Sequence, residues 1–380
     1  MASKVNIPPK LVLKGAPKEI GLEHGRQLQH QIRSQLEIYK EMFEYTSKMN
    51  WSQVHELAEE FRATLEQNTP DIHAEMLGIA EGAGVEMLDI VALNCRSEIS
   101  LGHFSDGCTS LSWKKGERGR VLSQNWDWTT KVGKNLAIVQ IEQSDKPTIY
   151  MVTEAGIVGK IGFNSAGVGV CLNAIKAPVC VSSKVPIHVA LRLCLESVSV
   201  DTALERLNSL GGAASSQHIL LADSSKALGL ELSPNGDVYL HEDANGMVIH
   251  TNHFIENKSV QEPPWLPSSP VRLKRCRELS RELLEKGVAG DKITPALLRE
   301  KIYADRYNAP EAICCSKILS RHPIRQTSTL FNIVMNLEPG KLRAEVVFGR
   351  PGYEEESAVV KLPMTTEKRR LSWLLRLFGL

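Results

Sequence analysis

The sequence changes character at one point, the run Ser105-Asp106-Gly107-Cys108-Thr109-Ser110. Before this run, apolar residues recur at helical spacing, and Thr69-Pro70 is typical of a helix start with Thr69 as the N-cap. After it, short runs rich in β-branched residues alternate with turn residues and predict strands. The later helices come in groups between sets of strands, so the pattern predicts a layered α+β fold rather than a doubly wound parallel sheet.

The expected elements follow this division. On the helical side we expect helices at 20–43, 52–65, 70–82 and 85–95, with Ser52 as the cap of the second. On the other side we expect strands at 120–123, 136–143, 148–154, 160–163, 168–173, 218–222, 227–232, 238–241, 247–252, 328–336 and 342–348. Further helices are expected at 187–197, 200–210, 271–286 and 295–304.

The Gly107-Cys108 bond is of a kind that can cleave itself. The Cys108 thiol attacks the Gly107 carbonyl, an N→S acyl shift gives a thioester, and water then frees Cys108 as a new N-terminus. That residue carries both a thiol nucleophile and an α-amine with a pKa of about 7.7–8.0 in model peptides, which suits a general base. A tight turn with a buried thiol accounts for the same residues, so this run alone leaves both interpretations open.

Composition excludes several classes of protein. The chain has 380 residues, a formal net charge of +1 and no basic stripe, which argues against nucleic-acid binding. Its eight cysteines form no C-x-x-C pair and lie mostly in apolar runs, as reduced core cysteines of an intracellular protein do. The start lacks an apolar signal core, and Phe378-Gly379-Leu380 is not a peroxisomal tripeptide, so we expect a cytoplasmic protein.

Two sets of charged residues flank the Gly-Cys bond. Asp127 lies one hairpin's length after Cys108, where it could hold the new ammonium group or orient the thiol; a solvated carboxylate at a strand end is the alternative. Arg96 and Glu98 lie shortly before the bond. They could position the cleavage loop, or they could form a structural ion pair.

A third polar group ends a predicted strand at His250-Thr251-Asn252-His253. An Asn side-chain amide such as that of Asn252 is a good neutral donor to an oxyanion. The two histidines invite a metal interpretation, but no third ligand stands at a recognisable spacing, so we expect no metal.

Together these motifs resemble one family, and they occur in its order from about Gly15 to Pro351. The motifs are Gly21-x-Glu23-His24-Gly25, Leu93-Asn94-x-Arg96-x-Glu98, Asp106-Gly107-Cys108-Thr109, Gln124-Asn125-Trp126-Asp127, a long block from Thr153 to Val168, His250-Thr251-Asn252-His253 and Thr329-Leu330-Phe331-Asn332-Ile333. The sequence is similar to the fungal acyl-coenzyme A:6-aminopenicillanic acid acyltransferases, which are cysteine-class N-terminal-nucleophile hydrolases.

The resemblance implies a four-layer αββα sandwich of two stacked antiparallel sheets between helix layers. It also implies cleavage before Cys108 into a helical segment, residues 1–107, and a catalytic segment, residues 108–380. Residue by residue, Cys108 matches the family's nucleophile, Asp127 a carboxylate needed for processing or activity, and Asn252 the oxyanion donor.

Two features depart from the family's pattern. Gln326 stands where the penicillin enzymes carry an arginine, and Arg325 lies one residue earlier. Because a neutral amide binds a carboxylate more weakly than a guanidinium does, we expect poor activity on penicillin precursors. The tail at about 367–380 is basic and amphipathic, so contact with a membrane surface and packing on the protein are both open.

The sequence thus predicts a self-processing amidohydrolase or acyltransferase that forms an acyl-thioester on Cys108. The expected partners are a small-molecule acyl donor, an amine acceptor and the two cleavage fragments as a heterodimer. No metal or organic cofactor is expected, and coenzyme A would enter only as the leaving group of a thioester substrate. The alternatives are a hydrolase-only enzyme resembling the β-alanyl-amine hydrolases, and an uncleaved, catalytically silent binding protein.

Overall fold

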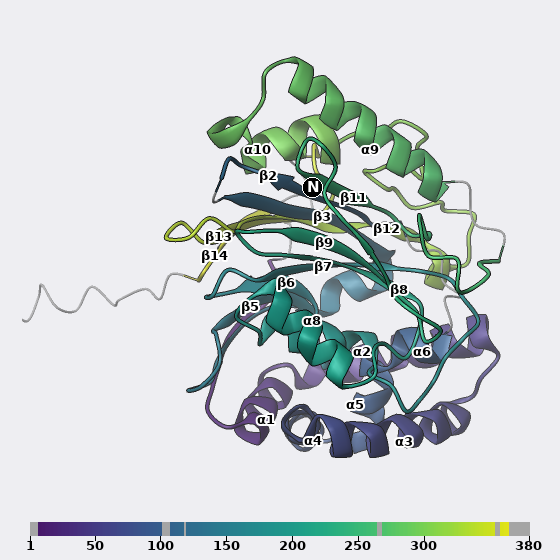
Figure 1. The fold of residues 1–380 in the computed structure, drawn as a ribbon. Helices are drawn as coiled ribbons and strands as arrows, with labels where there is room; N and C mark the ends of the chain where they lie inside the picture. The colour runs from purple at the N-terminus through teal and green to yellow at the C-terminus, as the bar shows by residue number, and fades with distance from the viewer. Residues whose placement is uncertain (1–6, 101–106, 118, 264–267, 354–357, 365–380) are drawn as a thin grey trace, which may run out of the picture.

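A computed structural model describes residues 7–100, 107–117, 119–263, 268–353 and 358–364. It shows an eight-stranded sheet stacked on a six-stranded sheet, with helices on both outer sides (Figure 1). The predicted four-layer αββα sandwich is therefore confirmed. The amphipathic tail expected at 367–380, and Ser105 and Asp106, lie outside the described residues.

The eight-stranded sheet runs in the order β1-β4-β5-β6-β7-β8-β9-β10. Its strands are β1 (Lys10–Lys14), β4 (Leu136–Glu142), β5 (Ile149–Glu154), β6 (Ile161–Asn164), β7 (Gly169–Ala174), β8 (Gln217–Ala222), β9 (Ala227–Leu232) and β10 (Val238–Leu240). The six-stranded sheet runs in the order β11-β2-β3-β12-β13-β14. Its strands are β11 (Met247–His250), β2 (Thr109–Lys114), β3 (Arg120–Thr129), β12 (Thr327–Asn336), β13 (Arg343–Phe348) and β14 (Ala358–Leu362).

The helices form the two outer layers. The N-terminal set lies at the bottom of Figure 1 and comprises α1 (Pro17–Gln27), α2 (Gln29–Ser47), α3 (Trp51–Asn68), α4 (Pro70–Ala83), α5 (Met87–Asn94) and α6 (Arg96–Ser100). Near the eight-stranded sheet lie α7 (Ile187–Leu195) and α8 (Val200–Ser209). At the top, α9 (Ser268–Glu285), α10 (Pro295–Leu298) and the π-helical turn η3 (Arg299–Tyr303) cover the six-stranded sheet.

Three sequence-based expectations need correction. The expected helical N-terminal segment is present, and it also contains the unpredicted strand β1, which pairs with β4 and buries Leu11 and Leu13. This pairing is parallel, whereas the resemblance implied antiparallel sheets. The helix expected at 20–43 is divided at Leu28. The helix expected at 52–65 is α3. It begins at Trp51, because Asn50 and not Ser52 forms the capping box with Gln53.

Side chains on β2 alternate between two separate cores. Ser110 points inward, where its hydroxyl donates to Asn173 Oδ1 on β7 at 2.7 Å. Leu111 points outward into an apolar cluster beneath α9 and η3, which also contains Trp113, Leu279 and Tyr303. Because alternate residues of a strand face opposite sides, Cys108 faces inward with Ser110, and Thr109 faces outward with Leu111.

The glycines of the motif Gly21-x-Glu23-His24-Gly25 allow α1 and α4 to approach closely. A Cβ added at Gly21 would lie 1.9 Å from the Glu75 carbonyl oxygen, and one at Gly78 would lie 2.2 Å from the Lys18 carbonyl oxygen. Both obstacles are backbone atoms of the facing helix, so neither can rotate away.

We therefore expect Gly21→Ala to lower the free energy of unfolding by about 2 kcal/mol or more, because the two helices must separate. Gly133→Ala is the control, since its Cβ would meet only Leu330 at an ordinary 3.7 Å. Urea unfolding followed by circular dichroism measures both. Equal midpoints for the two variants would show that the helices tolerate the added methyl group.

Candidate active site

Cys108 lies immediately before β2 and is fully buried between the two sheets. Its Sγ lies 3.7 Å from the backbone oxygen of Asp127 on β3. Thr109 pairs with Asn125, so continuing this antiparallel register by one residue sets Cys108 opposite Trp126. Both side chains belong to the large core between the sheets. The thiol is therefore held on a rigid strand end and not on a surface turn.

The Asp127 carboxylate lies against the residue that precedes Cys108. A Cβ added at Gly107 would lie 2.8 Å from Asp127 Oδ2. The other oxygen, Oδ1, accepts a hydrogen bond of 2.6 Å from the Thr329 hydroxyl on β12. A shift of register between Thr329 and Phe331 lets Thr329 face Asp127. The carboxylate is thus directed to the Gly107-Cys108 peptide, and the backbone oxygen of Asp127 lies near the thiol.

A buried arginine on α9 connects Cys108 to Asn252. Arg272 donates from Nη1 to the Cys108 carbonyl oxygen at 2.5 Å and to Thr109 Oγ1 at 3.1 Å. Its Nη2 donates to Asn252 Oδ1 at 3.0 Å. Thr109, a candidate supporting residue in the sequence, therefore accepts a hydrogen bond from this guanidinium.

Arg272 was not predicted from the sequence, although its position in α9 could have indicated a buried cation. Within α9 the buried residues include Arg272, Cys276, Leu279 and Leu283 at helical spacing. An arginine within the apolar stripe of a helix is unusual, because a charged side chain is rarely fully buried without a partner. Because α9 contains several other arginines and is strongly charged, Arg272 does not stand out in its sequence.

The contacts of Asn252 fix the orientation of its amide. Because Oδ1 accepts from Arg272, Nδ2 is the donor, and it donates to the Ala174 carbonyl oxygen at 3.0 Å. The Asn252 backbone N–H donates to Ser269 Oγ at 2.8 Å. The side chain therefore presents N–H groups, as an oxyanion donor must.

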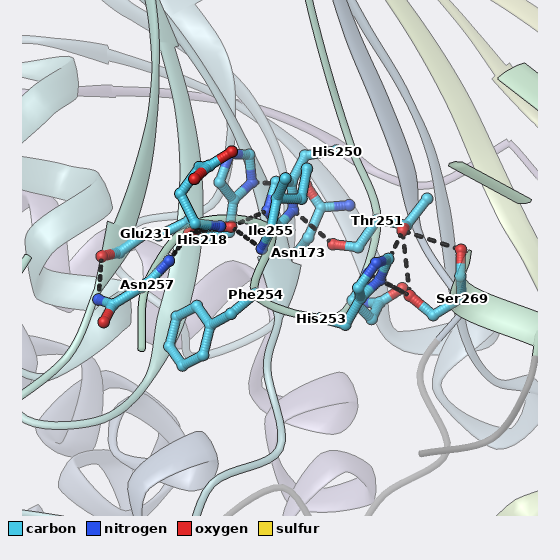
Figure 2. Close-up of polar contacts among 12 residues, drawn as sticks. Asn173, His218, Glu231, His250, Thr251, His253, Phe254, Ile255, Asn257 and Ser269 are labelled. Atoms are coloured by element: carbon cyan, nitrogen blue, oxygen red, sulfur yellow. Dashed lines mark hydrogen bonds and ion pairs between the residues drawn. The ribbon is translucent and has the colours of Figure 1, made fainter. Parts of the chain in front are cut away.

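A buried acid anchors the segment that carries Asn252, as Figure 2 shows. Glu231 on β9 accepts from His250 Nε2 at 2.9 Å, from the backbone N–H groups of Glu256 and Asn257 at 3.0 and 2.7 Å, and from that of Ile255. A carboxylate that accepts from several donors in this way holds the loop after β11 firmly against β9.

The two histidines beside Asn252 have different partners. His250 stacks on His218 with ring centroids 3.5 Å apart, and His218 in turn contacts Asn173 Oδ1 at 3.0 Å. His253 Nδ1 lies 2.8 Å from Ser269 Oγ. Burial, and to a smaller extent repulsion from His250, lowers the pKa of His253 to about 4. Within the described ranges, no three potential metal-ligating side chains gather in one place.

Arg96 and Glu98 do not pair with each other. Arg96 forms an ion pair of 2.8 Å with Glu154 Oε1. Glu98 accepts from the backbone N–H of Ile187, at the start of α7, and from the Ser215 hydroxyl at 2.9 and 2.7 Å. Both residues thus fasten α6, the last described element before Gly107, to the rest of the protein.

Arg325 and Gln326 directly precede β12. Arg325 is exposed beside Met42 and Trp128, and Gln326 donates its amide to the Leu319 and Arg321 carbonyl oxygens at 3.3 and 3.0 Å. Among the described residues, neither side chain contacts Cys108 or Asn252. The guanidinium at the centre of the site is that of Arg272.

Replacing Arg272 by Met should lower the free energy of unfolding by about 2–4 kcal/mol, because three buried oxygens lose a charged donor. The exposed Arg277, five residues further along α9, provides the control, and Arg277→Ala should have little effect. Thermal unfolding of both variants is the measurement. Equal melting temperatures would mean that Arg272 does not tie these elements together.

Comparisons with known proteins identify the family of this chain. Residues 113–349 match the family model for acyl-coenzyme A:6-aminopenicillanic acid acyl-transferase. A relative from Emericella nidulans, named acyl-coenzyme A:6-aminopenicillanic-acid-acyltransferase 40 kDa form, is 37% identical over 351 residues, which is 91% of this chain and 94% of the relative. The solved structure of penicillin V acylase from Agrobacterium tumefaciens has a TM-score of 0.45 and 15% identity, over 63% of this chain and 83% of that one. On the family match and the 37% identity, the chain belongs to the acyl-coenzyme A:6-aminopenicillanic acid acyltransferase family.

Proposed function

We propose that this protein is a self-processing acyltransferase and amidohydrolase whose nucleophile is the thiol of Cys108. The observation that carries the proposal is the placement of the Gly107-Cys108 bond. The thiol is fixed at a strand end, the Asp127 carboxylate abuts Gly107, and Arg272 ties the Cys108 backbone to Asn252. A cysteine with only a structural role in the core would need none of these three contacts.

Processing begins when Cys108 Sγ attacks the Gly107 carbonyl carbon. The C–N bond breaks, the thiol proton passes to the departing nitrogen, and a thioester joins Gly107 to Sγ. Water hydrolyses this thioester and leaves a Gly107 carboxylate, a free thiol and the α-amine of Cys108. The Asp127 carboxylate lies where it can accept a hydrogen bond from this amine and stabilise the ammonium group that forms once the amine has taken the thiol proton. Cleavage would leave residues 1–107 and 108–380 as two chains of one molecule.

Turnover uses the same thiol on a substrate acyl group. The α-amine takes the thiol proton, Sγ attacks the acyl carbonyl, and Asn252 Nδ2 donates to the oxyanion that develops. Collapse expels the leaving group, which takes the proton from the amine, and leaves an acyl-thioester on Cys108. An amine or water then accepts the acyl group.

The substrate class follows from the relatives. The Emericella relative is named for transfer between acyl-coenzyme A and 6-aminopenicillanic acid, so we propose an acyl-thioester or N-acyl amine as donor and a small amine as acceptor. Mature enzyme with an acyl-thioester, assayed with and without 6-aminopenicillanic acid or a neutral amine, measures transfer against hydrolysis. Acyl-amine products support transfer; release of free acid alone would identify a hydrolase.

The purified protein should consist of two fragments, residues 1–107 and 108–380, and Cys108→Ala should remain one chain because it lacks the attacking thiol. Intact-mass spectrometry distinguishes these states. Cys171→Ala, which alters another buried cysteine in the same core, is the control and should be cleaved. An active preparation that holds only the uncut chain would refute the proposal.

Asn252→Ala should reduce turnover by roughly 10²–10³-fold, the usual cost of losing one oxyanion donor. Asn252→Asp separates two roles, since it keeps an acceptor for Arg272 but has no N–H to donate. We expect both variants to be slow in a steady-state assay of the mature enzyme. If Asn252→Asp turned over normally, Asn252 would serve only to position Arg272.

A further inference from the structure

A buried lysine reaches the inner face on which Cys108 lies. Lys160 directly precedes β6 and has a side chain that is 1% exposed. Its Nζ donates to Glu154 Oε1 at 2.8 Å and lies 4.3 Å from the centre of the Trp126 ring. When the register of β2 and β3 is continued by one residue, Trp126 stands opposite Cys108. The Lys160 ammonium therefore lies beside the Trp126–Cys108 pair.

The carboxylate that holds Lys160 is shared with other groups. Arg96 Nη2 donates to the same Oε1 at 2.8 Å, and Gln35 and Tyr39 donate to Oε2 at 2.6 and 2.7 Å. An ammonium has three N–H donors, yet among the described residues Glu154 is the one acceptor of Lys160. The lysine therefore keeps donor capacity and positive charge that Glu154 does not use.

The structure assigns Lys160 as a positioning residue for Cys108: its ammonium stabilises the thiolate from the side opposite Asp127. This inference rests on the proposed function, because it concerns the same nucleophile. Lys160 keeps its own protons throughout, and the thiol proton still passes to the α-amine of Cys108. The arrangement gives the thiol a fixed cation in a water-poor core, where an opposite charge favours the ionised form.

The surrounding groups are consistent with this role. Burial and then repulsion from Arg96 lower the pKa of Lys160 to about 8, whereas Glu154 and an ionised Cys108 act in the opposite direction. His188 on α7 also faces the cluster, and burial, Lys160 and Arg96 together hold its pKa well below the ordinary value, so it is neutral. Tyr39 is un-ionised, since burial raises its pKa well above normal.

The test is the pH dependence of alkylation of Cys108 by iodoacetamide, which reacts with the thiolate. Mass spectrometry of the N-terminal peptide of the 108–380 fragment separates Cys108 from the other cysteines. In Lys160→Met and Lys160→Gln the midpoint should rise by about one pH unit, the shift expected when a nearby opposite charge is lost. Lys160→Arg keeps the positive charge, so its alkylation midpoint should equal that of the wild type. Lys131→Met, which removes a surface lysine paired with Glu41, is the control.

Should the neutral variants fail to fold, Glu154→Gln provides an independent measurement. This variant removes a negative charge and retains Lys160, so the alkylation midpoint of Cys108 should fall or remain unchanged. A higher midpoint would overturn the assignment. An unchanged midpoint in folded Lys160→Met would overturn it as well. If wild-type protein is not cleaved at all, the proposed function fails, whereas cleaved variants with a wild-type midpoint contradict only the role of Lys160.

Discussion

The alternation of side chains along β2 is the constraint on which the site depends. It sends the Cys108 thiol into the core between the sheets and sends Thr109 to the outer face beneath α9. Neighbouring β3 repeats the division, with Trp126 inward and Asp127 outward. A single strand end therefore presents the thiol to one environment and the peptide before it to another.

Two buried charge groups hold this strand end from opposite sides. On the outer side, Arg272 binds Cys108, Thr109 and Asn252. On the inner side, Glu154 forms ion pairs with Arg96 and Lys160. Burial alone would raise the pKa of Glu154, but these two cations outweigh it and keep that pKa below its ordinary value. Isolated charges would be costly at such depth, so each group is stable only as a complete network.

Much of the fold was predictable because the patterns were local. The hydrophobic spacing gave the order of strands and helices after Cys108, and the Gly-Cys run marked the strand end. Strand β1 was missed because it is only five residues long, begins and ends with a lysine, and is stabilised by pairing with β4 far along the chain.

The residue types of Cys108, Asp127 and Asn252 suggested one chemistry in the sequence, and their catalytic roles stay predictions. The site was not predictable where the role depends on which residues meet in space. Arg272 and Lys160 look like ordinary cations in the sequence, and Arg96 and Glu98 look like a pair. The folded structure shows that Arg272 and Lys160 are buried and that Arg96 and Glu98 bind other residues.

The most direct test of the central claim is to trap the acyl-enzyme. Mature protein mixed with an acyl-thioester and quenched in acid should show the acyl mass on the 108–380 fragment. Peptide analysis should place it on the sulfur of Cys108, with the α-amine unmodified and the adduct released by hydroxylamine. An acyl group on any other residue, or turnover with no adduct under conditions that trap thioesters, would contradict the account.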